Sequence, residues 1–179
     1  MKNSKVFVIV AVEENFGIGK DGVMPWHFKC EAQYFNKITT HVDDPTKQNA
    51  VFMGRTTWLS LPEKYRPLPG RKNIILTREG EVPPDTKGCM IKYSPEQAIE
   101  FLRADENIET IFVIGGASIY KYAVESLDLD GLYITKIHKD YNCDTFFPRI
   151  PNATYTHEQK LGEAEEDGTK IEFFLYAKK

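Results

Sequence analysis

The chain has few cysteines, no excess of positive charge and no long apolar run, and each absence excludes a class of protein. Its three cysteines, Cys30, Cys89 and Cys143, are widely spaced without a CxxC pair, so they predict neither a disulfide framework nor a zinc site. They are typical of reduced thiols in a cytoplasmic protein. The net charge of -3 provides no basic field, which disfavours nucleic acid as a partner.

The apolar segment near the N-terminus is too short to span a membrane, and two acids, Glu13 and Glu14, close it. We therefore expect neither secretion nor membrane anchoring. With 179 residues, 41% of them hydrophobic and 27% charged, the chain fits one globular domain over residues 1–179. A domain of this size is expected to fold without a metal or a disulfide.

Short apolar runs alternate with helical patterns over the first two thirds of the chain, which is typical of an α/β domain with parallel strands. The continuous β-branched run at 6–12 predicts a strand buried on both faces at the centre of the sheet. Further strands are predicted at 50–53, 73–77, 90–93 and 110–114. Helices are predicted at 31–39, 56–61, 94–103 (with Ser94 as N-cap) and 117–124.

The last third alternates apolar and polar residues without a helical pattern, which predicts antiparallel strands at 131–138, 154–160 and 170–178. The acidic segment 162–169 (GEAEEDGT) is expected to be a solvated hairpin loop. The patterns together predict a single-domain α/β fold with a mixed, mostly parallel sheet. We expect about eight strands, with an antiparallel C-terminal strand, flanked by about four helices.

Gly17, Gly19 and Gly22 satisfy the GxGxxG spacing of dinucleotide-binding folds, but their context does not fit that motif. The motif requires its third glycine to lie inside a helix, whereas Pro25 follows within three residues and no helical pattern begins before about Lys29. We therefore expect a mobile loop at 15–23, in which the glycines adopt positive φ angles.

Glu31 is the only acid between Gly22 and Thr40, and it falls on the same helical face as Phe35 and Ile38. A carboxylate is costly to bury unless a partner meets it, so this residue predicts a pocket with one acid, covered by the preceding loop. The alternative is a helix-start acid that lies in water and interacts with the helix dipole.

Two strand ends carry glycine directly before a predicted helix, a pattern suited to phosphate. At 54–57 (GRTT), free backbone N–H groups, hydroxyls and a guanidinium converge. At 115–118 (GGAS), two glycines allow close approach to the backbone. Either could be a tight turn without a ligand, but their occurrence together favours a cofactor that carries phosphate.

Two arginines extend this pattern. Thr77 ends a predicted strand and Arg78 follows it, and both are candidates for binding an additional phosphate, the alternative being a solvated strand end. Arg71 follows a Pro-Leu-Pro-Gly turn that would aim its planar side chain at a carboxylate, the alternative being a surface arginine.

Taken together, these stretches resemble the dihydrofolate reductase family. The similar segments occur in the family's order: IVAV, IGKDGVMPW, the 31–39 helix, FMGRTTWLSLP, RPLPGRKNIILTR, FVIGGASIYKYA, LYITKI and DTFFP. The resemblance implies a dihydrofolate reductase-like fold. It also implies reduction of 7,8-dihydrofolate to tetrahydrofolate for one-carbon metabolism, with hydride transfer from NADPH to C6 and protonation of N5.

The resemblance assigns roles in the substrate pocket. It implies that Glu31 accepts hydrogen bonds from the pterin 2-amino group and N3–H, that Thr135 hydrogen-bonds this acid, and that Trp26 holds a bridging water. Arg71 is the expected partner of the α-carboxylate on the glutamate tail. The remaining residues expected along the substrate are Ile9, Val10, Phe28, Phe35, Ser60, Leu68 and Ile114.

The resemblance also implies an NADPH site, with the 15–23 loop as a lid that excludes water. Ala11, Ile18 and Gly19 are expected against the nicotinamide and its ribose. The pyrophosphate is expected along Gly54, Arg55, Thr56, Thr57, Gly115, Gly116, Ala117, Ser118, Ile119 and Tyr120. Leu76, Thr77 and Arg78 are expected at the adenosine end, where the cation at Arg78 favours the 2′-phosphate and hence NADPH over NADH.

Three positions differ from many members of the family: Ala32, Ala117 and Lys29. Ala32 stands beside the acid in place of a larger apolar residue, which would widen the pocket. Two alternatives to the reductase stay open: a riboflavin-precursor reductase of the same fold, and a noncatalytic folate- or nucleotide-binding module. The expected partners are dihydrofolate and antifolates, without nucleic acid or membrane, and the protein is expected to be a cytoplasmic monomer.

Overall fold

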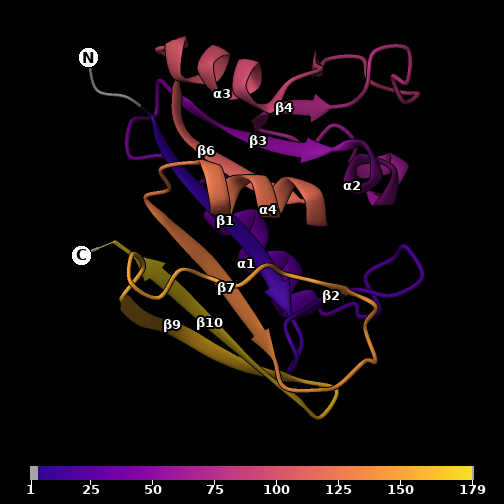
Figure 1. The fold of residues 1–179 in the computed structure, drawn as a ribbon, viewed down its shortest axis with the longest axis vertical. Coiled ribbons are helices and arrows are strands. Elements are labelled where there is room, and N and C mark those ends of the chain that lie inside the picture. The colour runs from indigo at the N-terminus through magenta and orange to yellow at the C-terminus, as the bar shows by residue number, and fades with distance from the viewer. Residues whose placement is uncertain (1–3, 179) are drawn as a thin grey trace.

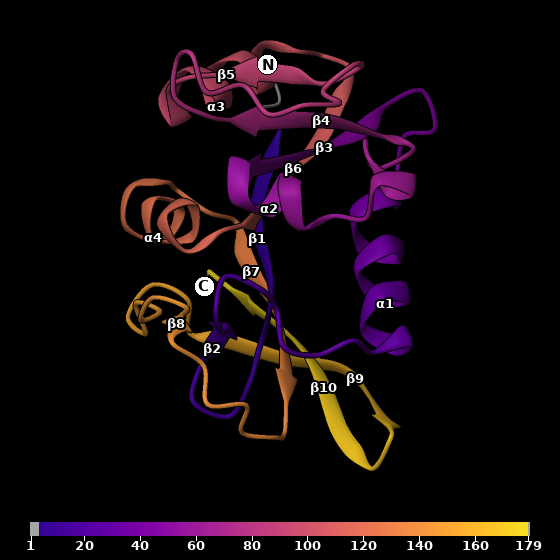
Figure 2. The same cartoon turned by 90° about the vertical axis from the view of Figure 1, so that its right-hand side faces the viewer.

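The fold is a twisted eight-stranded sheet with helices on both faces, seen in a computed structural model that describes residues 4–178 (Figures 1 and 2). The strands of this sheet are β1 (Lys5–Val12), β3 (Gln48–Gly54), β4 (Arg71–Leu76), β5 (Met90–Lys92), β6 (Ile108–Gly115), β7 (Gly131–Ile137), β9 (His157–Glu166) and β10 (Thr169–Ala177). Their order is β5-β4-β3-β6-β1-β7-β10-β9. A separate small sheet pairs β2 (Gly17–Gly19) with β8 (Thr145–Phe146).

Strand β1 lies in the interior of the sheet, as the sequence predicts. It runs parallel to β6 on one side and to β7 on the other. Val6, Val8 and Val10 pack into the core on one face, whereas Ile9 packs into the core on the other. A continuous β-branched run is therefore required here, because both faces of the strand are covered.

Two pairs of helices cover the two faces. Helices α1 (Lys29–Thr40) and α2 (Arg55–Ser60) lie on one face, and α3 (Pro95–Ala104) and α4 (Ala117–Ser126) lie on the other (Figure 2). A short 3-10 helix at Glu63–Tyr65 follows α2. The Ser94 hydroxyl caps α3 by accepting the N–H of Gln97, as predicted. Within residues 4–178, every helix is too short or too polar to cross a membrane.

The prediction that 131–138 adds to the sheet as an antiparallel strand is wrong for one of its two neighbours. Strand β7 runs parallel to β1 and antiparallel only to β10. The physical reason is the crossover helix α4, which returns the chain across the sheet before β7 begins and so makes the connection parallel. The final strands, which are joined by a hairpin, are antiparallel as predicted.

The acidic segment 162–169 is not a loop, so that prediction is also wrong. Strand β9 continues to Glu166, and the turn consists only of Asp167 and Gly168, with φ angles of 51° and 75°. Glu163 and Glu165 point into solvent from this edge strand, where charged residues are well tolerated. The signal for the short turn was the Asp-Gly pair, because these residues tolerate positive φ at both central positions.

The 15–23 segment differs from the prediction in the role of its glycines. Of the three glycines in the GxGxxG spacing, only Gly22 has a positive φ, of 79°. Gly17 is needed for a different reason, because a Cβ there would lie 2.3 Å from the Cβ of Cys143. No helix begins between β2 and Lys29, which agrees with the rejection of a dinucleotide fingerprint at this position.

Candidate active site

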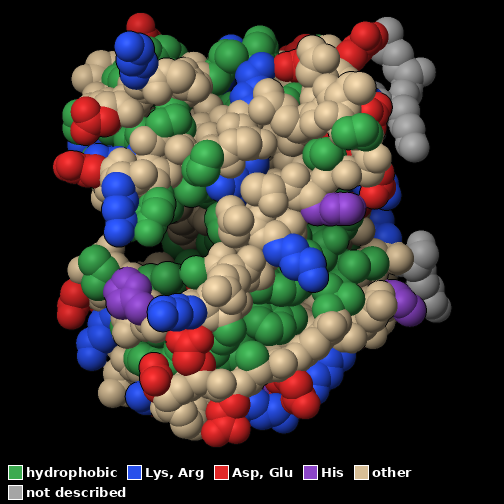
Figure 3. All heavy atoms as spheres, turned by 180° about the vertical axis from the view of Figure 1, so that it is seen from behind, with side chains coloured by type: hydrophobic (Ala, Val, Ile, Leu, Met, Phe, Trp, Pro, Cys, Tyr) green, Lys and Arg blue, Asp and Glu red, His purple; other side chains and the backbone are tan. Residues whose placement is uncertain are grey.

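Several sequence-predicted residues, among them Ala11, Gly54 and Gly115, lie at the carboxyl ends of strands, near the place where the chain changes direction across the sheet. From β1 the chain crosses to β3 through α1, whereas from β6 it crosses to the opposite side and forms β7 through α4. Ligands of open α/β sheets bind at such a switch point, outside the carboxyl ends of the strands. The space-filling view shows the surface hollowed on the side where Figure 1 places α2 and the segment joining β1 to β2 (Figure 3).

Glu31 lies in the first turn of α1 and is half-buried. Burial removes water from its carboxyl group and raises the pKa from 4.5 to about 7. The ion pairs found among residues 4–178 do not include this side chain. Of the two alternatives, the structure therefore favours an acid in a pocket, without an ion-pair partner, over an acid that lies in water.

The turn that carries Glu31 is held by a residue that sequence reasoning missed. The Lys29 N–H donates to Oε2 of Glu166 at 2.8 Å, and the Cys30 N–H donates to Oε1 at 3.0 Å. The N-cap position is Phe28, whose side chain makes no cap hydrogen bond, so the carboxylate from the end of β9 replaces a local cap. No local pattern signals such a contact, because the two segments are far apart in sequence.

Two more predicted residues line the same region. Trp26 is 2% exposed, and its Nε1 is buried without a hydrogen-bond partner among the described residues. A buried donor of this kind normally meets a water or a ligand, so its environment fits the predicted bridging water. Thr135 is buried on β7 beside Ala11 of β1. Its hydrogen bond to Glu31 stays a prediction.

The residues predicted along the substrate fall into two groups. Ile9, Leu68 and Ile114 are buried together in the core under α1 and α2, and Phe35 packs against them. Phe28 instead packs with Trp26. The Val10 side chain lies in the core on the other face of the sheet, so only its backbone can face a ligand in this hollow. Ser60 is exposed at the end of α2, and its hydroxyl donates to the Thr57 carbonyl.

Arg71 is buried, which is not the arrangement expected of a surface arginine. Its side chain is 7% exposed, and burial lowers the pKa of the guanidinium. Nε donates to the Pro69 carbonyl at 2.9 Å, and Nη1 donates to Oγ1 of Thr39 at 2.9 Å. The ion pairs found among residues 4–178 do not include it. The site therefore presents a desolvated cation whose remaining donors suit an anionic ligand.

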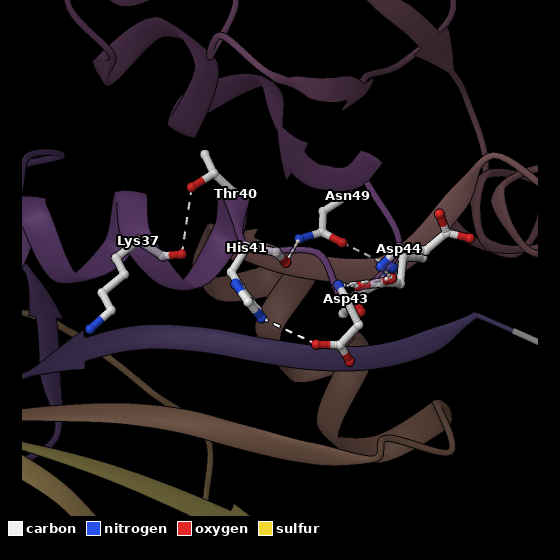
Figure 4. Close-up of polar contacts among 8 residues, drawn as sticks. Lys37, Thr40, His41, Asp43, Asp44 and Asn49 are labelled. Atoms are coloured by element: carbon white, nitrogen blue, oxygen red, sulfur yellow. Dashed lines mark hydrogen bonds and ion pairs between the residues drawn. The ribbon is translucent and has the colours of Figure 1, made fainter. Parts of the chain in front are cut away.

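The end of α1 that supports Arg71 is fixed by Asn49. Its Nδ2 donates to the His41 carbonyl at 2.7 Å (Figure 4). The same Nδ2 donates to the Thr39 carbonyl at 3.0 Å, and Oδ1 accepts the Thr110 N–H at 3.1 Å. Since the Thr39 hydroxyl also donates to the Phe35 carbonyl, its free lone pair is turned toward Arg71. The amide of Asn49 thus ties α1, β3 and β6 at the point where the cation sits.

Helix α1 sets the spacing between the acid and the cation. Glu31 and Thr39 are eight residues apart on this helix, which corresponds to about 12 Å along its axis. The two charges therefore cannot neutralise each other. An elongated ligand with a polar heterocycle at one end and a carboxylate at the other matches this spacing.

The two glycine-marked turns come together, as their joint occurrence predicted. A Cβ at Gly54 would lie 3.8 Å from both the Gly115 oxygen and the Gly116 nitrogen. Gly115 has a φ of 127°, and a Cβ there would lie 3.0 Å from Oγ1 of Thr57. The helices that follow have Gly54 and Gly116 at their N-caps and no side-chain cap, so their first N–H groups are directed at one shared cradle.

The other residues predicted to contact the cofactor differ in their exposure to solvent. Arg55, Thr56 and Ser118 are exposed, whereas Ile119 is buried in the core. The hydroxyl of Tyr120 lies 2.9 Å from the Ile9 oxygen and 2.8 Å from the Ile114 oxygen, so it links β1 to β6. The half-buried positions in this set are Ala11, Ile18, Gly19, Gly54, Thr57, Leu76, Gly116 and Ala117.

The proposed adenosine end lies after β4. Arg78 is exposed there and is free to meet a phosphate in solvent. Thr77 is buried, and its hydroxyl donates to the Glu81 carbonyl at 2.9 Å. Its single hydroxyl hydrogen is therefore engaged within the protein, which leaves Arg78 as the stronger candidate of the two.

The fold and the site together define an α/β protein with a ligand hollow at a topological switch point and an anion cradle beside it. The chain belongs to the dihydrofolate reductase family, whose sequence model matches residues 5–178. The dihydrofolate reductase of Drosophila melanogaster is 43% identical over 178 residues and covers 96% of each chain. That of Heliothis virescens is 40% identical over 184 residues and covers 100% of each.

A solved structure supports the same conclusion. The dihydrofolate reductase of Schistosoma mansoni has a TM-score of 0.83 and 32% sequence identity, covering 99% of this chain and 100% of that one. The fold class predicted from the sequence is confirmed. The family match also favours an oxidoreductase of this family over the riboflavin-precursor reductase.

Replacing Glu31 with Gln is expected to stabilise the ligand-free protein above pH 7, because a neutral amide escapes the penalty for burying charge. In the wild type the folded state holds its proton up to about pH 7 and the unfolded state only to 4.5, so stability falls as pH rises through this window. The gain above pH 7 is at most about 3 kcal/mol. Urea unfolding at pH 5 and pH 8 measures it.

The matched control is Glu14→Gln, which makes the same chemical change at an exposed site. It is expected to leave the pH dependence of unfolding as in the wild type. An identical pH dependence for Glu31→Gln and the wild type would contradict the burial of the charge.

Proposed function

We propose that this protein reduces 7,8-dihydrofolate to 5,6,7,8-tetrahydrofolate with NADPH. The observation that carries the proposal is the pair of unmatched groups along α1: the half-buried Glu31 at one end and the buried Arg71 beside the other. Dihydrofolate has the complementary groups, since its pterin presents an N–H edge at one end and its glutamate presents carboxylates at the other. Membership of the family supports the same substrate.

Glu31 orients the pterin in this proposal. One carboxylate accepts two parallel hydrogen bonds, from the 2-amino group and from N3–H, and so fixes both the position and the rotation of the ring. Orientation of this kind brings the reacting carbon into line with the hydride donor. The nearby Thr135 and the water on Trp26 complete the polar edge of the pocket.

The proton for N5 arrives through water. No second acid was predicted in the pocket, and the unpartnered Nε1 of Trp26 supplies a donor that can hold such a water in place. With its pKa near 7, Glu31 takes up or releases a proton at small cost, and its charge stabilises the protonated pterin. This chain's own contribution is therefore to place one water and one charge.

The cradle between Gly54 and Gly115 fits the pyrophosphate of NADPH. A side chain at either glycine would press against the neighbouring turn or helix, so glycine lets the two backbones lie close together, and two helix starts without side-chain caps adjoin them. When bound, NADPH supplies the hydride. Arg55 and Thr56 would hold the phosphates from the exposed side of α2, and Arg78 would hold the 2′-phosphate.

The remaining expectations belong to the same proposal. The 15–23 segment acts as a lid that excludes water from the reacting atoms. The protein acts as a cytoplasmic monomer that also takes antifolates. A noncatalytic folate-binding module is the alternative that the experiments must separate, because it would bind methotrexate without turning over dihydrofolate.

The direct test mixes the protein with NADPH and dihydrofolate and follows the loss of reduced-nicotinamide absorbance. For Glu31→Gln, we expect turnover to fall at least about 100-fold, because the amide keeps the shape but loses the charge that orients the ring. NADPH affinity, measured by fluorescence titration, should stay nearly unchanged. Equal losses of turnover and of NADPH affinity would contradict the role given to Glu31.

Replacing Arg71 with Ala is expected to raise the KM for dihydrofolate about 10- to 100-fold, because a desolvated, charge-assisted contact is lost. The affinity for pteroic acid, which lacks the glutamate, should change little. Titration of both ligands provides the internal control. A similar loss for both would show that Arg71 supports the fold of the pocket and does not bind the tail.

Replacing Arg78 with Ala is expected to raise the KM for NADPH roughly fivefold and to leave the KM for NADH unchanged, since only NADPH carries the 2′-phosphate. The contact is exposed, so the difference should shrink as salt is added. Steady-state kinetics with each cofactor at low and high salt measures this. A parallel change for both cofactors would place the arginine elsewhere.

A further inference from the structure

Glu13 is a buried acid that the proposed reaction does not use. It follows β1 directly, and its side chain is only 2% exposed. Sequence reasoning treated it as the polar end of an apolar run. The ion pairs found in the described part of the chain do not include it, so its oxygens rely on hydrogen bonds alone. A buried carboxyl group is costly unless such partners meet it.

The partners of Glu13 come from two separate segments. Oε1 accepts the Asn15 N–H at 2.7 Å and the Gly17 N–H at 2.8 Å, both in the segment proposed as the lid. Oε2 accepts the Tyr141 N–H at 3.3 Å, from the segment that follows β7. One side chain thus joins the base of the lid to a neighbouring loop.

The junction between the base of the lid and the segment that follows β7 is closely packed. A Cβ at Gly17 would lie 2.3 Å from the Cβ of Cys143 and 2.8 Å from Oε1 of Glu13. The two segments are also joined by backbone hydrogen bonds, from Glu14 N–H to the Lys139 oxygen and from the Asp144 N–H to the Gly19 oxygen. The loop therefore meets its neighbour without space for an intervening water at this point.

Tyr141 connects this junction to Trp26. Its ring packs against Trp26, with centroids 5.3 Å apart and the planes inclined at 53°. Trp26, in turn, is the buried residue whose Nε1 lacks a partner among residues 4–178. The backbone of Tyr141 is held by Glu13, and its ring supports the tryptophan that is proposed to hold the water.

We propose that Glu13 is a positioning residue that fixes the lid base and the Trp26 wall relative to each other, and so sets the rate of reduction without contacting a ligand. This inference rests on the proposed function. A carboxylate suits the role because it has acceptors on both oxygens and no hydrogen to oppose three N–H donors. A glutamine here would keep one oxygen for Asn15 and Gly17 but would set its NH₂ group against the Tyr141 N–H.

The experiment compares Glu13→Gln with Glu14→Gln, the neighbouring exposed acid changed in the same way. For Glu13→Gln, we expect turnover at saturating ligands to fall about tenfold, with the KM for dihydrofolate changed less than about twofold. The indole N–H signal of Trp26 in the NMR spectrum, assigned with Trp58→Phe, should shift. Glu14→Gln should change neither quantity.

A second variant keeps the proposal open to test if Glu13→Gln does not fold. Tyr141→Leu retains the backbone N–H that Glu13 accepts but removes the ring that supports Trp26. It should shift the same indole signal and lower turnover in the same way, again with little change in KM.

Several outcomes would overturn the inference in whole or in part. An unmoved indole signal in Glu13→Gln would mean that the acid does not hold Trp26. A moved signal with unchanged turnover would mean that Glu13 holds the two segments together without setting the rate. An equal loss of turnover in Glu14→Gln would mean that the effect is not specific to Glu13. Wild-type protein that fails to reduce dihydrofolate would refute the proposed function and the effect on rate, whereas the indole signal would still decide whether the junction exists.

Discussion

The rest of the structure depends on one constraint: two groups of opposite charge are taken out of water at the two ends of α1 and cannot reach each other. Glu31 and the Arg71 site are separated by about 12 Å of helix, and the described residues offer neither of them an ion-pair partner. Desolvated groups without partners lower the stability of the empty protein. A ligand that meets both groups would offset this loss of stability.

Keeping such groups in place requires a scaffold whose own polar groups have hydrogen-bond partners. Glu166 caps the start of α1, Asn49 ties its end, and Tyr120 links the two central strands beneath the hollow. The contacts of Glu166 and Tyr120 join segments that are distant in sequence. The site is therefore held in place by contacts within the protein, whereas Glu31, Arg71 and Nε1 of Trp26 keep capacity for a ligand, which is the arrangement that preorganisation demands.

Sequence reasoning predicted the elements that have a local pattern and missed the features that depend on contacts between distant segments. The central strand, the four helices and the two glycine turns follow from periodicity and from turn residues, and the structure shows all of them. The direction of β7 depended on recognising α4 as a crossover, and the extent of β9 depended on reading Asp167 and Gly168 as a complete turn. The cap from Glu166 and the contact of Glu13 with Tyr141 carried no local signal, because each joins segments that are remote in sequence.

The cap that Glu166 places on α1 has a consequence for the order of assembly. Helix α1, which carries Glu31, leaves the ribosome before its cap does, because Glu166 belongs to β9, much later in the sequence. During synthesis, the early helix start must wait with exposed N–H groups until that strand has emerged and found its place. The turn that carries Glu31 is thus completed only after β9 has been synthesised and has joined the sheet.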